Sequence, residues 1–138
     1  TQDTRWVLPE FVDKAISNKQ ISVHSDGSQV RAFCYVSDIV SAFQSALETA
    51  NSEIINVGND SYPISIKDLA EKIISLTNSQ SQIKFVPFDE SNRNRIEIIK
   101  RIPDINKARK ILNYSPKITL DEGIEKVVKY RKEINSDK

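Results

Sequence analysis

The sequence predicts a small, helix-rich α/β domain with short strands. Five segments repeat apolar residues with a helical period, and four short segments carry strand-forming residues. The two kinds alternate along the chain without an internal repeat or a low-complexity linker. The 138 residues suffice for one hydrophobic core, so we expect a single domain over residues 1–134 and a frayed tail at residues 135–138.

The first helix is expected to begin near Pro9, which a helix tolerates in its first turn, and to bury Phe11. Strands are predicted at residues 21–24 and 30–36, separated by a turn. The next helix, with Ser37 or Asp38 as its cap, carries one apolar stripe, which consists of Ile39, Val40, Phe43, Ala46, Leu47 and Ala50. Because the stripe has a helical period, we place Phe43 in the core and expect its truncation to alanine to cost about 3–5 kcal/mol.

Two more strands are predicted in the second half of the chain, at residues 53–57 and 83–86. Between them lies a helix that ends near Thr77 and Asn78. The apolar pattern fails from residue 88 to residue 102, where no element is expected.

Three helix starts in this half carry side chains that can satisfy backbone N–H groups. Ser65 precedes the helix that ends near Thr77, and Asp104 precedes a short helix. Thr119 and Glu122 have the spacing of a capping box for the last helix.

Composition excludes several functions. Only three glycines are present and they lie far apart, so neither a dinucleotide-binding glycine loop nor a P-loop can be formed. One histidine and one cysteine cannot supply a metal cluster, and a net charge of +1 argues against nucleic-acid binding. No apolar run is long enough to span a membrane, so we expect a cytoplasmic protein. The absence of methionine indicates a piece of a longer chain.

The single residues with reactive side chains give weak signals. Cys34 lies between two aromatic residues on a predicted strand, so we interpret it as a packing thiol and not as a nucleophile. His24 is interpreted as structural or exposed. Arg31 and Arg101 follow loops and could bind an anion, with a solvated surface charge as the alternative. We assign no catalytic and no metal-binding residue.

Several segments together resemble a known family. Residues 25–38 resemble the pattern G-x-G-x-Q-x-R-x-F-x-Y-V-x-D of the extended short-chain dehydrogenase/reductases, the nucleotide-sugar epimerases, dehydratases and decarboxylases. Further matches follow in family order over essentially the whole chain, at residues 7–11, 55–59, 65–70, 100–108, 112–116 and 119–124. These motifs most resemble those of the UDP-glucuronate decarboxylases. Only the C-terminal, substrate-binding half of the family is matched, without the Rossmann half that carries NAD and the catalytic Tyr-x-x-x-Lys.

The resemblance implies the substrate domain of an NAD-dependent enzyme of polysaccharide biosynthesis, whose parent would be a homodimer. It implies that Arg31 and Arg101 bind the diphosphate of a nucleotide sugar. It also implies that Leu8, Pro9 and His24 line the base site and that Gln29 assists through its amide. The chain itself would bind no cofactor and would be catalytically incomplete.

Some positions depart from the family pattern, and a second function stays open. Ser25 replaces a glycine, His24 a tyrosine, and Asn113-Tyr114 a Gly-Trp pair. The loop between Pro87 and Lys100 also differs, so base, sugar and reaction type stay open. The alternative function is a non-catalytic interaction domain that retained the fold.

Overall fold

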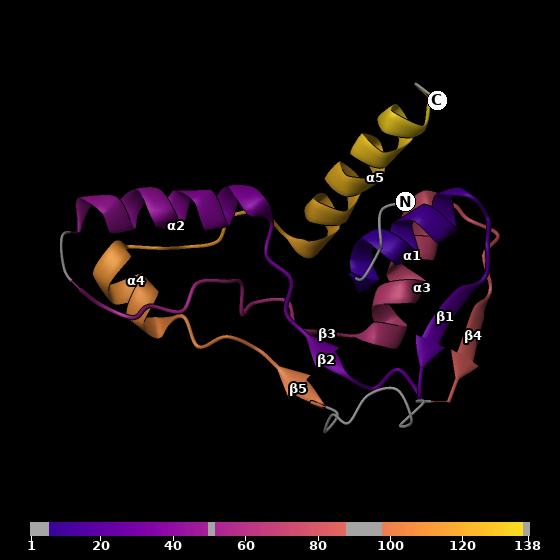
Figure 1. Cartoon of the computed structure of the whole chain (residues 1–138), viewed down its shortest axis with the longest axis horizontal. Helices are drawn as coiled ribbons and strands as arrows, with labels where there is room; N and C mark the ends of the chain where they lie inside the picture. Colours follow the sequence, from indigo (N-terminus) through magenta and orange to yellow (C-terminus); the bar gives the residue numbers. More distant parts are fainter. Residues whose placement is uncertain (1–5, 50–51, 88–97, 137–138) are drawn as a thin grey trace. The chain divides into compact units, whose positions relative to one another are not determined.

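A computed structural model describes residues 6–49, 52–87 and 98–136. The chain divides into two compact units (Figure 1). The α1–α3 unit comprises Thr1–Gln29, Ser65–Ile99 and Ile124–Lys138, and the α2–α4 unit comprises Val30–Ile64 and Lys100–Gly123. None of the helices that the structure describes is long and apolar enough to cross a membrane. The predicted class, a helix-rich α/β fold with short strands, is confirmed, whereas the single domain over residues 1–134 stays a prediction.

The α1–α3 unit combines helices with one pair of parallel strands. Its elements are α1 (Val7–Ile16), β1 (Ile21–His24), α3 (Ile66–Thr77), β4 (Ile83–Val86) and most of α5 (Leu120–Ser136). Strand β1 pairs with β4 from Ile21 opposite Ile83 to His24 opposite Val86 (Figure 1). Parallel strands need a long crossover, which α3 provides while packing on α1 and β1. The core side chains are almost fully buried: Phe11, Val12, Ala15, Ile21, Val23, Leu69, Ala70, Ile73 and Ile124.

One position in this unit requires glycine for a steric reason. Gly27 has φ +74°, and a Cβ atom there would lie 2.7 Å from Val23 Cγ1 and 2.9 Å from Lys67 Cβ. Its carbonyl accepts a hydrogen bond from the Lys67 N–H at 3.0 Å. The turn after β1 therefore rests directly on the start of α3, and only glycine fits there.

The α2–α4 unit is built from two helices and very short strands. Its elements are β2 (Val30–Arg31), α2 (Val36–Glu48), β5 (Lys100–Arg101) and α4 (Asn106–Leu112), and β3 (Ile64–Ser65) lies at its border. Strand β2 lies between β3 and β5 in the sheet. The core cluster is formed by Ala42, Ile105, Ala108, Leu112 and Tyr114, with Ile55, Val57 and Ile111 packed against it.

Two of the predicted helix caps form, Ser65 in the α1–α3 unit and Thr119 in the α2–α4 unit. The Asp68 N–H donates to Ser65 Oγ at 3.0 Å, and the Glu122 N–H donates to Thr119 Oγ1 at 3.3 Å. The Thr119 N–H in turn donates to the Glu122 carboxylate at 2.8 Å, which completes the capping box. The prediction of Asp104 as the cap of α4 is wrong, because the cap position is Ile105, which makes no side-chain cap bond. The Asp104 carboxylate instead accepts from the N–H of Asn106, two residues further on, at 2.9 Å.

The prediction for helix α2 is wrong in two respects. The helix begins at Val36 after Tyr35, without a side-chain cap, so Ser37 and Asp38 lie inside its first turn. The predicted core stripe is also largely on the surface, because the side chain that contacts the core is Ala42. Phe43 is 66% exposed and Leu47 is 86% exposed. Ala50, the last member of the predicted stripe, lies outside the described residues.

Two strand predictions are also wrong. The strand expected at residues 30–36 ends at Arg31, because its parallel partner β5 is only two residues long. Residues 53–57 form no strand, since they pair with no other strand among the described residues. Strands β3 and β5 were not predicted. Helix α5 continues to Ser136, two residues into the tail expected to fray.

Candidate functional site

Two arginines stand side by side on neighbouring strands of the α2–α4 unit. In the parallel pairing of β2 with β5, Arg31 is the register partner of Arg101. Register partners on adjacent strands point to the same face of a sheet, about 4.7–4.9 Å apart along the hydrogen-bonding direction. Like charges on directly opposed residues destabilise strand pairing, and an anion bound by both side chains would offset this repulsion. The pair is therefore suited to a ligand with two negative charges.

The surroundings of the two arginines differ. Arg31 is half-buried and donates from Nη1 to the Val30 carbonyl at 2.8 Å, which orients its guanidinium. Arg101 is exposed and has no carboxylate partner among the described residues. By contrast, Arg109 holds Asp60 with two hydrogen bonds, of 2.9 and 2.7 Å. These bonds lower the pKa of the Asp60 carboxyl and raise the pKa of Arg109, so the charge of that guanidinium is already satisfied.

The segment after Arg101 is held by contact with a glycine. A Cβ atom at Gly58 would lie 2.8 Å from Pro103 Cγ. The Gly58 carbonyl also accepts a hydrogen bond from Tyr114 Oη at 2.9 Å. The chain that follows β5 is therefore fixed against the α2–α4 core.

A second pair of candidate residues lies in the α1–α3 unit, at the end of β1. Gln29 is buried, and its Nε2 donates to the His24 carbonyl at 3.4 Å. Its own carbonyl accepts from the Ile66 N–H at 3.0 Å, at the start of α3. The His24 side chain is exposed. Gln29 therefore shapes the loop after β1, while the His24 imidazole remains accessible from solvent.

The remaining candidates, Leu8 and Pro9, occupy the first turn of α1 and are half-buried. Helix α1 positions them, not the loop that carries His24 and Gln29. Thus the structure pairs Arg31 with Arg101 and His24 with Gln29, and it places Leu8 and Pro9 on a separate element.

Sequence reasoning missed a buried polar cluster in the α2–α4 unit. Asp38 and Asn59 are 4% and 3% exposed, and both hold the backbone of Ile118. The Ile118 N–H donates to Asp38 Oδ2 at 3.1 Å, and Asn59 Nδ2 donates to the Ile118 carbonyl at 3.4 Å. Asp38 lies in the first turn of α2, where its position predicts a helix cap and gives no sign of a distant partner.

Cys34 and Tyr114 form a partly buried contact, with 3.5 Å between Sγ and Oη. Burial raises the pKa of the Cys34 thiol and also the pKa of the Tyr114 hydroxyl. Both groups therefore stay protonated near neutral pH. This agrees with the interpretation of Cys34 as a packing residue and not as a nucleophile.

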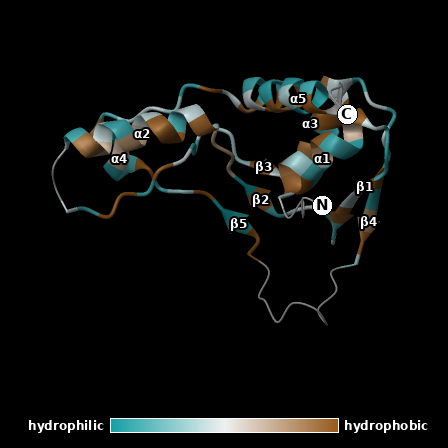
Figure 2. Ribbon diagram, turned by 45° about the horizontal axis from the view of Figure 1, so that its top comes forward, coloured by the Kyte–Doolittle hydropathy of each residue, from teal (hydrophilic) through white to brown (hydrophobic). Residues whose placement is uncertain are grey.

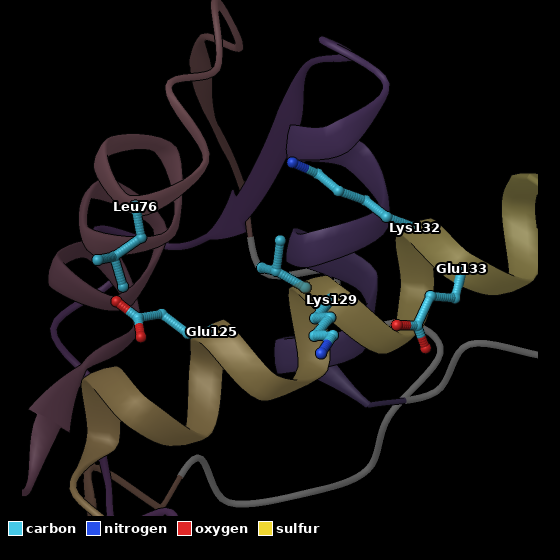
Figure 3. A pocket seen from close by; sticks show the side chains of 6 residues that line it. Leu76, Glu125, Lys129, Lys132 and Glu133 are labelled. Atoms are coloured by element: carbon cyan, nitrogen blue, oxygen red, sulfur yellow. The ribbon is translucent and has the colours of Figure 1, made fainter.

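One hollow in the described part of the chain is lined by none of the predicted site residues. A groove of about 370 Å³ lies between α3 and α5, lined by Leu76 and by α5 side chains that include Glu125, Lys129 and Lys132 (Figure 3). Its charged side chains have mixed signs and do not converge on one point (Figure 3). Among the described residues, no group of three or more His, Cys, Asp or Glu could hold a metal ion.

Known proteins with similar sequences include two decarboxylases named for UDP-linked sugar acids. UDP-N-acetyl-alpha-D-glucosaminuronate decarboxylase of Bacillus cytotoxicus is 35% identical over 133 residues, which cover 95% of this chain and 41% of the relative. UDP-glucuronic acid decarboxylase 1 of Danio rerio is 36% identical over 124 residues, 90% of this chain and 28% of the relative. The chain thus spans well under half of the length of these relatives.

Solved structures agree with the sequence matches. UDP-glucuronic acid 4-epimerase from Bacillus cereus, crystallised with UDP-glucuronic acid and NAD, superimposes with a TM-score of 0.83 at 25% identity. The match covers 95% of this chain and 41% of that one. UDP-glucose 4-epimerase from Thermotoga maritima, solved with UDP-glucose, gives a TM-score of 0.84 at 25% identity, over 94% of this chain and 40% of that one.

The fold and these similarities define the class: part of an extended short-chain dehydrogenase/reductase, as the sequence motifs predicted. More specifically, the family model of GDP-mannose 4,6 dehydratase matches residues 3–127, and the chain belongs to this family.

Proposed function

We propose that this chain is the nucleotide-sugar-binding part of an NAD-dependent epimerase, dehydratase or decarboxylase. One observation carries the proposal: Arg31 and Arg101 stand in register on adjacent parallel strands. A diphosphate offers two negative charges at a spacing that two neighbouring guanidinium groups can bind with charge-assisted hydrogen bonds. Relatives that match this chain are named for reactions on UDP-sugars, which contain this diphosphate.

Further roles follow for the residues of the α1–α3 unit. Leu8 and Pro9 would contact the nucleotide base with their apolar surfaces, and the exposed His24 ring would stack on it or donate a hydrogen bond. Gln29 would act indirectly, because its side chain already bonds the His24 carbonyl and thereby fixes the loop. Gln29 is thus proposed as a positioning residue.

We propose that the chemistry of the parent enzyme depends on NAD, which the similar crystal structures of UDP-glucuronic acid 4-epimerase from Bacillus cereus contain. When bound, NAD supplies transient oxidation of a sugar hydroxyl, which acidifies the neighbouring positions. The residues of this chain would hold the nucleotide end, and that binding energy would keep the sugar in place for reaction. We place the parent in the cytoplasm, as a homodimer that makes precursors of polysaccharides.

The chain by itself is expected to show neither turnover nor NAD affinity. Its three isolated glycines cannot form the loop that brings backbone N–H groups to a dinucleotide pyrophosphate. Saturable NAD binding by the isolated chain in a calorimetric titration would contradict this assignment.

The test of the proposed site uses the intact parent enzyme and UDP-glucuronic acid. Arg31→Lys should weaken binding, because an ammonium group cannot reproduce the planar fork of a guanidinium, and Arg31→Ala should weaken it further. Arg109→Ala removes an arginine that is already paired with Asp60 and serves as the matched control. NAD affinity, measured on the same proteins, should stay unchanged. If both ligands lose affinity equally, the fold is damaged; if neither does, Arg31 is not part of the site.

A further inference from the structure

Ser25, the residue that follows β1, has an unusual backbone conformation. Its φ of +53° lies in the left-handed region, which is costlier for a residue with a side chain than for glycine. The other non-glycine residues with positive φ in the described part of the chain are asparagines, a type that tolerates this region: Asn18, Asn78 and Asn113. Serine is therefore the exception among them. Strained residues of this kind cluster at functional sites.

Contacts within the chain do not explain why a serine stands at this position. The Ser25 N–H donates to the Val86 carbonyl at 2.9 Å, and a glycine would make the same bond. The side chain is half-buried, and its hydroxyl forms no hydrogen bond with any residue that the structure describes. The fold therefore accepts the strained conformation and gains no internal hydrogen bond from the hydroxyl.

Ser25 lies at an edge of the α1–α3 unit where the ends of several elements meet. Strands β1 and β4 are parallel, so both end at this edge (Figure 1). Helix α1 contacts β1 and is joined to it by the short segment 17–20, so it runs in the opposite direction. The 10 residues of α1 span about 15 Å and the 4 residues of β1 about 13 Å, so the start of the helix lies level with the end of the strand. Ligands of open parallel sheets bind outside such carboxyl ends of the strands.

The same edge carries the residues that we propose for the nucleotide base. Leu8 and Pro9 lie in the first turn of α1, which Figure 2 shows to begin with hydrophobic residues, and the exposed His24 ends β1. Apolar surfaces suit the faces of a base, whereas its polar edge needs groups that form hydrogen bonds. A serine hydroxyl can donate one hydrogen bond and accept others. Ser25 therefore supplies such a group directly beside His24.

We propose that the Ser25 hydroxyl binds the polar edge of the nucleotide base and thereby contributes to the choice of base. The inference rests on the proposed function, because that function brings a nucleotide to this edge. Relatives that match the chain are named for UDP-linked sugars, and the uracil of UDP presents carbonyl oxygens that accept a hydrogen bond from a hydroxyl. A glycine, which stands here in the family pattern, has no side chain to make this bond.

Two substitutions in the intact parent enzyme separate the hydroxyl from the backbone strain. Ser25→Ala removes the hydroxyl and keeps a side chain at positive φ, whereas Ser25→Gly removes the hydroxyl and the strain together. Both variants should weaken UDP binding by roughly three- to tenfold, the range of one neutral hydrogen bond. Only Ser25→Gly should raise the melting temperature. Unchanged UDP affinity in both variants would overturn the proposal, and so would a lower melting temperature of Ser25→Gly, because the serine would then serve stability.

Inorganic pyrophosphate as a second ligand separates the base from the diphosphate. In calorimetric titrations, Ser25→Ala should weaken the binding of UDP but not of pyrophosphate, whereas Arg31→Ala should weaken both. Ser28→Ala is the matched control, since Ser28 is an exposed serine of the same turn without a positive φ, and it should change neither Kd. Equal losses for both ligands in Ser25→Ala would contradict a contact with the base. Loss of UDP affinity in Ser25→Ala without any effect of Arg31→Ala would reject only the diphosphate site, and the reverse result would reject only the role of Ser25.

Discussion

The two units differ in how completely their apolar residues are covered. In the α1–α3 unit, Phe11, which the sequence places in the core, is 2% exposed, and Ile73 of α3 is 0% exposed. In the α2–α4 unit, Phe43 belongs to an equally regular helical stripe, yet it lies on the surface. Helical periodicity thus identifies an apolar face, but only the chain packed on that face decides whether it is buried.

The largest expected effect tests the burial of apolar side chains in the α1–α3 unit. Phe11→Ala should lower the free energy of unfolding by about 3–5 kcal/mol, because the ring is fully packed in the α1–α3 core. Urea unfolding followed by circular dichroism measures this change. A loss below about 1 kcal/mol, within the range of surface substitutions, would show that this core is loosely packed.

A smaller effect is expected from the polar contact inside the α2–α4 core. Tyr114→Phe removes the hydroxyl that donates to the Gly58 carbonyl and leaves this carbonyl without its partner. The free energy of unfolding should fall by about 1–3 kcal/mol. Tyr62→Phe is the control, because Tyr62 is exposed and its hydroxyl should contribute little. Equal values for the two variants in urea titrations would rule out a stabilising role for the Tyr114 hydroxyl.

Helix caps should contribute similarly in the two units. Ser65→Ala and Thr119→Ala each remove a side-chain oxygen that accepts a backbone N–H, and each should cost about 0.5–2 kcal/mol. Ser65→Asp and Thr119→Ser keep an acceptor at the same position and should retain most of the stability. Thermal unfolding of the four variants measures these losses of stability. If only one of the two alanine variants is destabilised, the two caps do not contribute equally.

The smallest effect is expected at the exposed stripe. Phe43→Ala should change the stability of the isolated chain by no more than about 0.5 kcal/mol, because a largely exposed side chain loses few contacts. A loss near that of Phe11→Ala would contradict the exposure of Phe43 and restore the expectation drawn from periodicity. The two phenylalanine variants, measured side by side, therefore compare the two units directly.

Features that depend on neighbouring residues could be predicted from the sequence. Ser65 and Thr119 cap their helices as expected, since the capping oxygen and the N–H it satisfies lie three residues apart. Helix α3 ends at Thr77 as predicted, with Asn78 in the left-handed conformation that closes a helix. Such local chemistry does not depend on the rest of the chain.

Features that depend on distant residues could not be predicted. Asp38 bonds the backbone of Ile118, eighty positions away, so a cap was the only role that its neighbours suggested. Residues 53–57 have the composition of a strand, but a strand needs a partner, and the described residues offer none. The pairing of Arg31 with Arg101 likewise depends on the register of β2 and β5, which no local pattern encodes. The residues alone suggest that either arginine could bind an anion, and only the family resemblance assigns both to one diphosphate.

The central claim is that Arg31 and Arg101 bind one diphosphate, and a double-mutant cycle on the intact enzyme tests it most directly. Kd for UDP-glucuronic acid is measured for the parent, for Arg31→Ala, for Arg101→Ala and for the double variant. Each single variant should lose about 1.5–3 kcal/mol of binding free energy, since each removes hydrogen bonds to a charged group. Because both arginines contact the same group, the two losses should not be additive, with a coupling of about 0.5–3 kcal/mol. Losses that add to within about 0.5 kcal/mol, or no loss at all, would contradict a shared diphosphate.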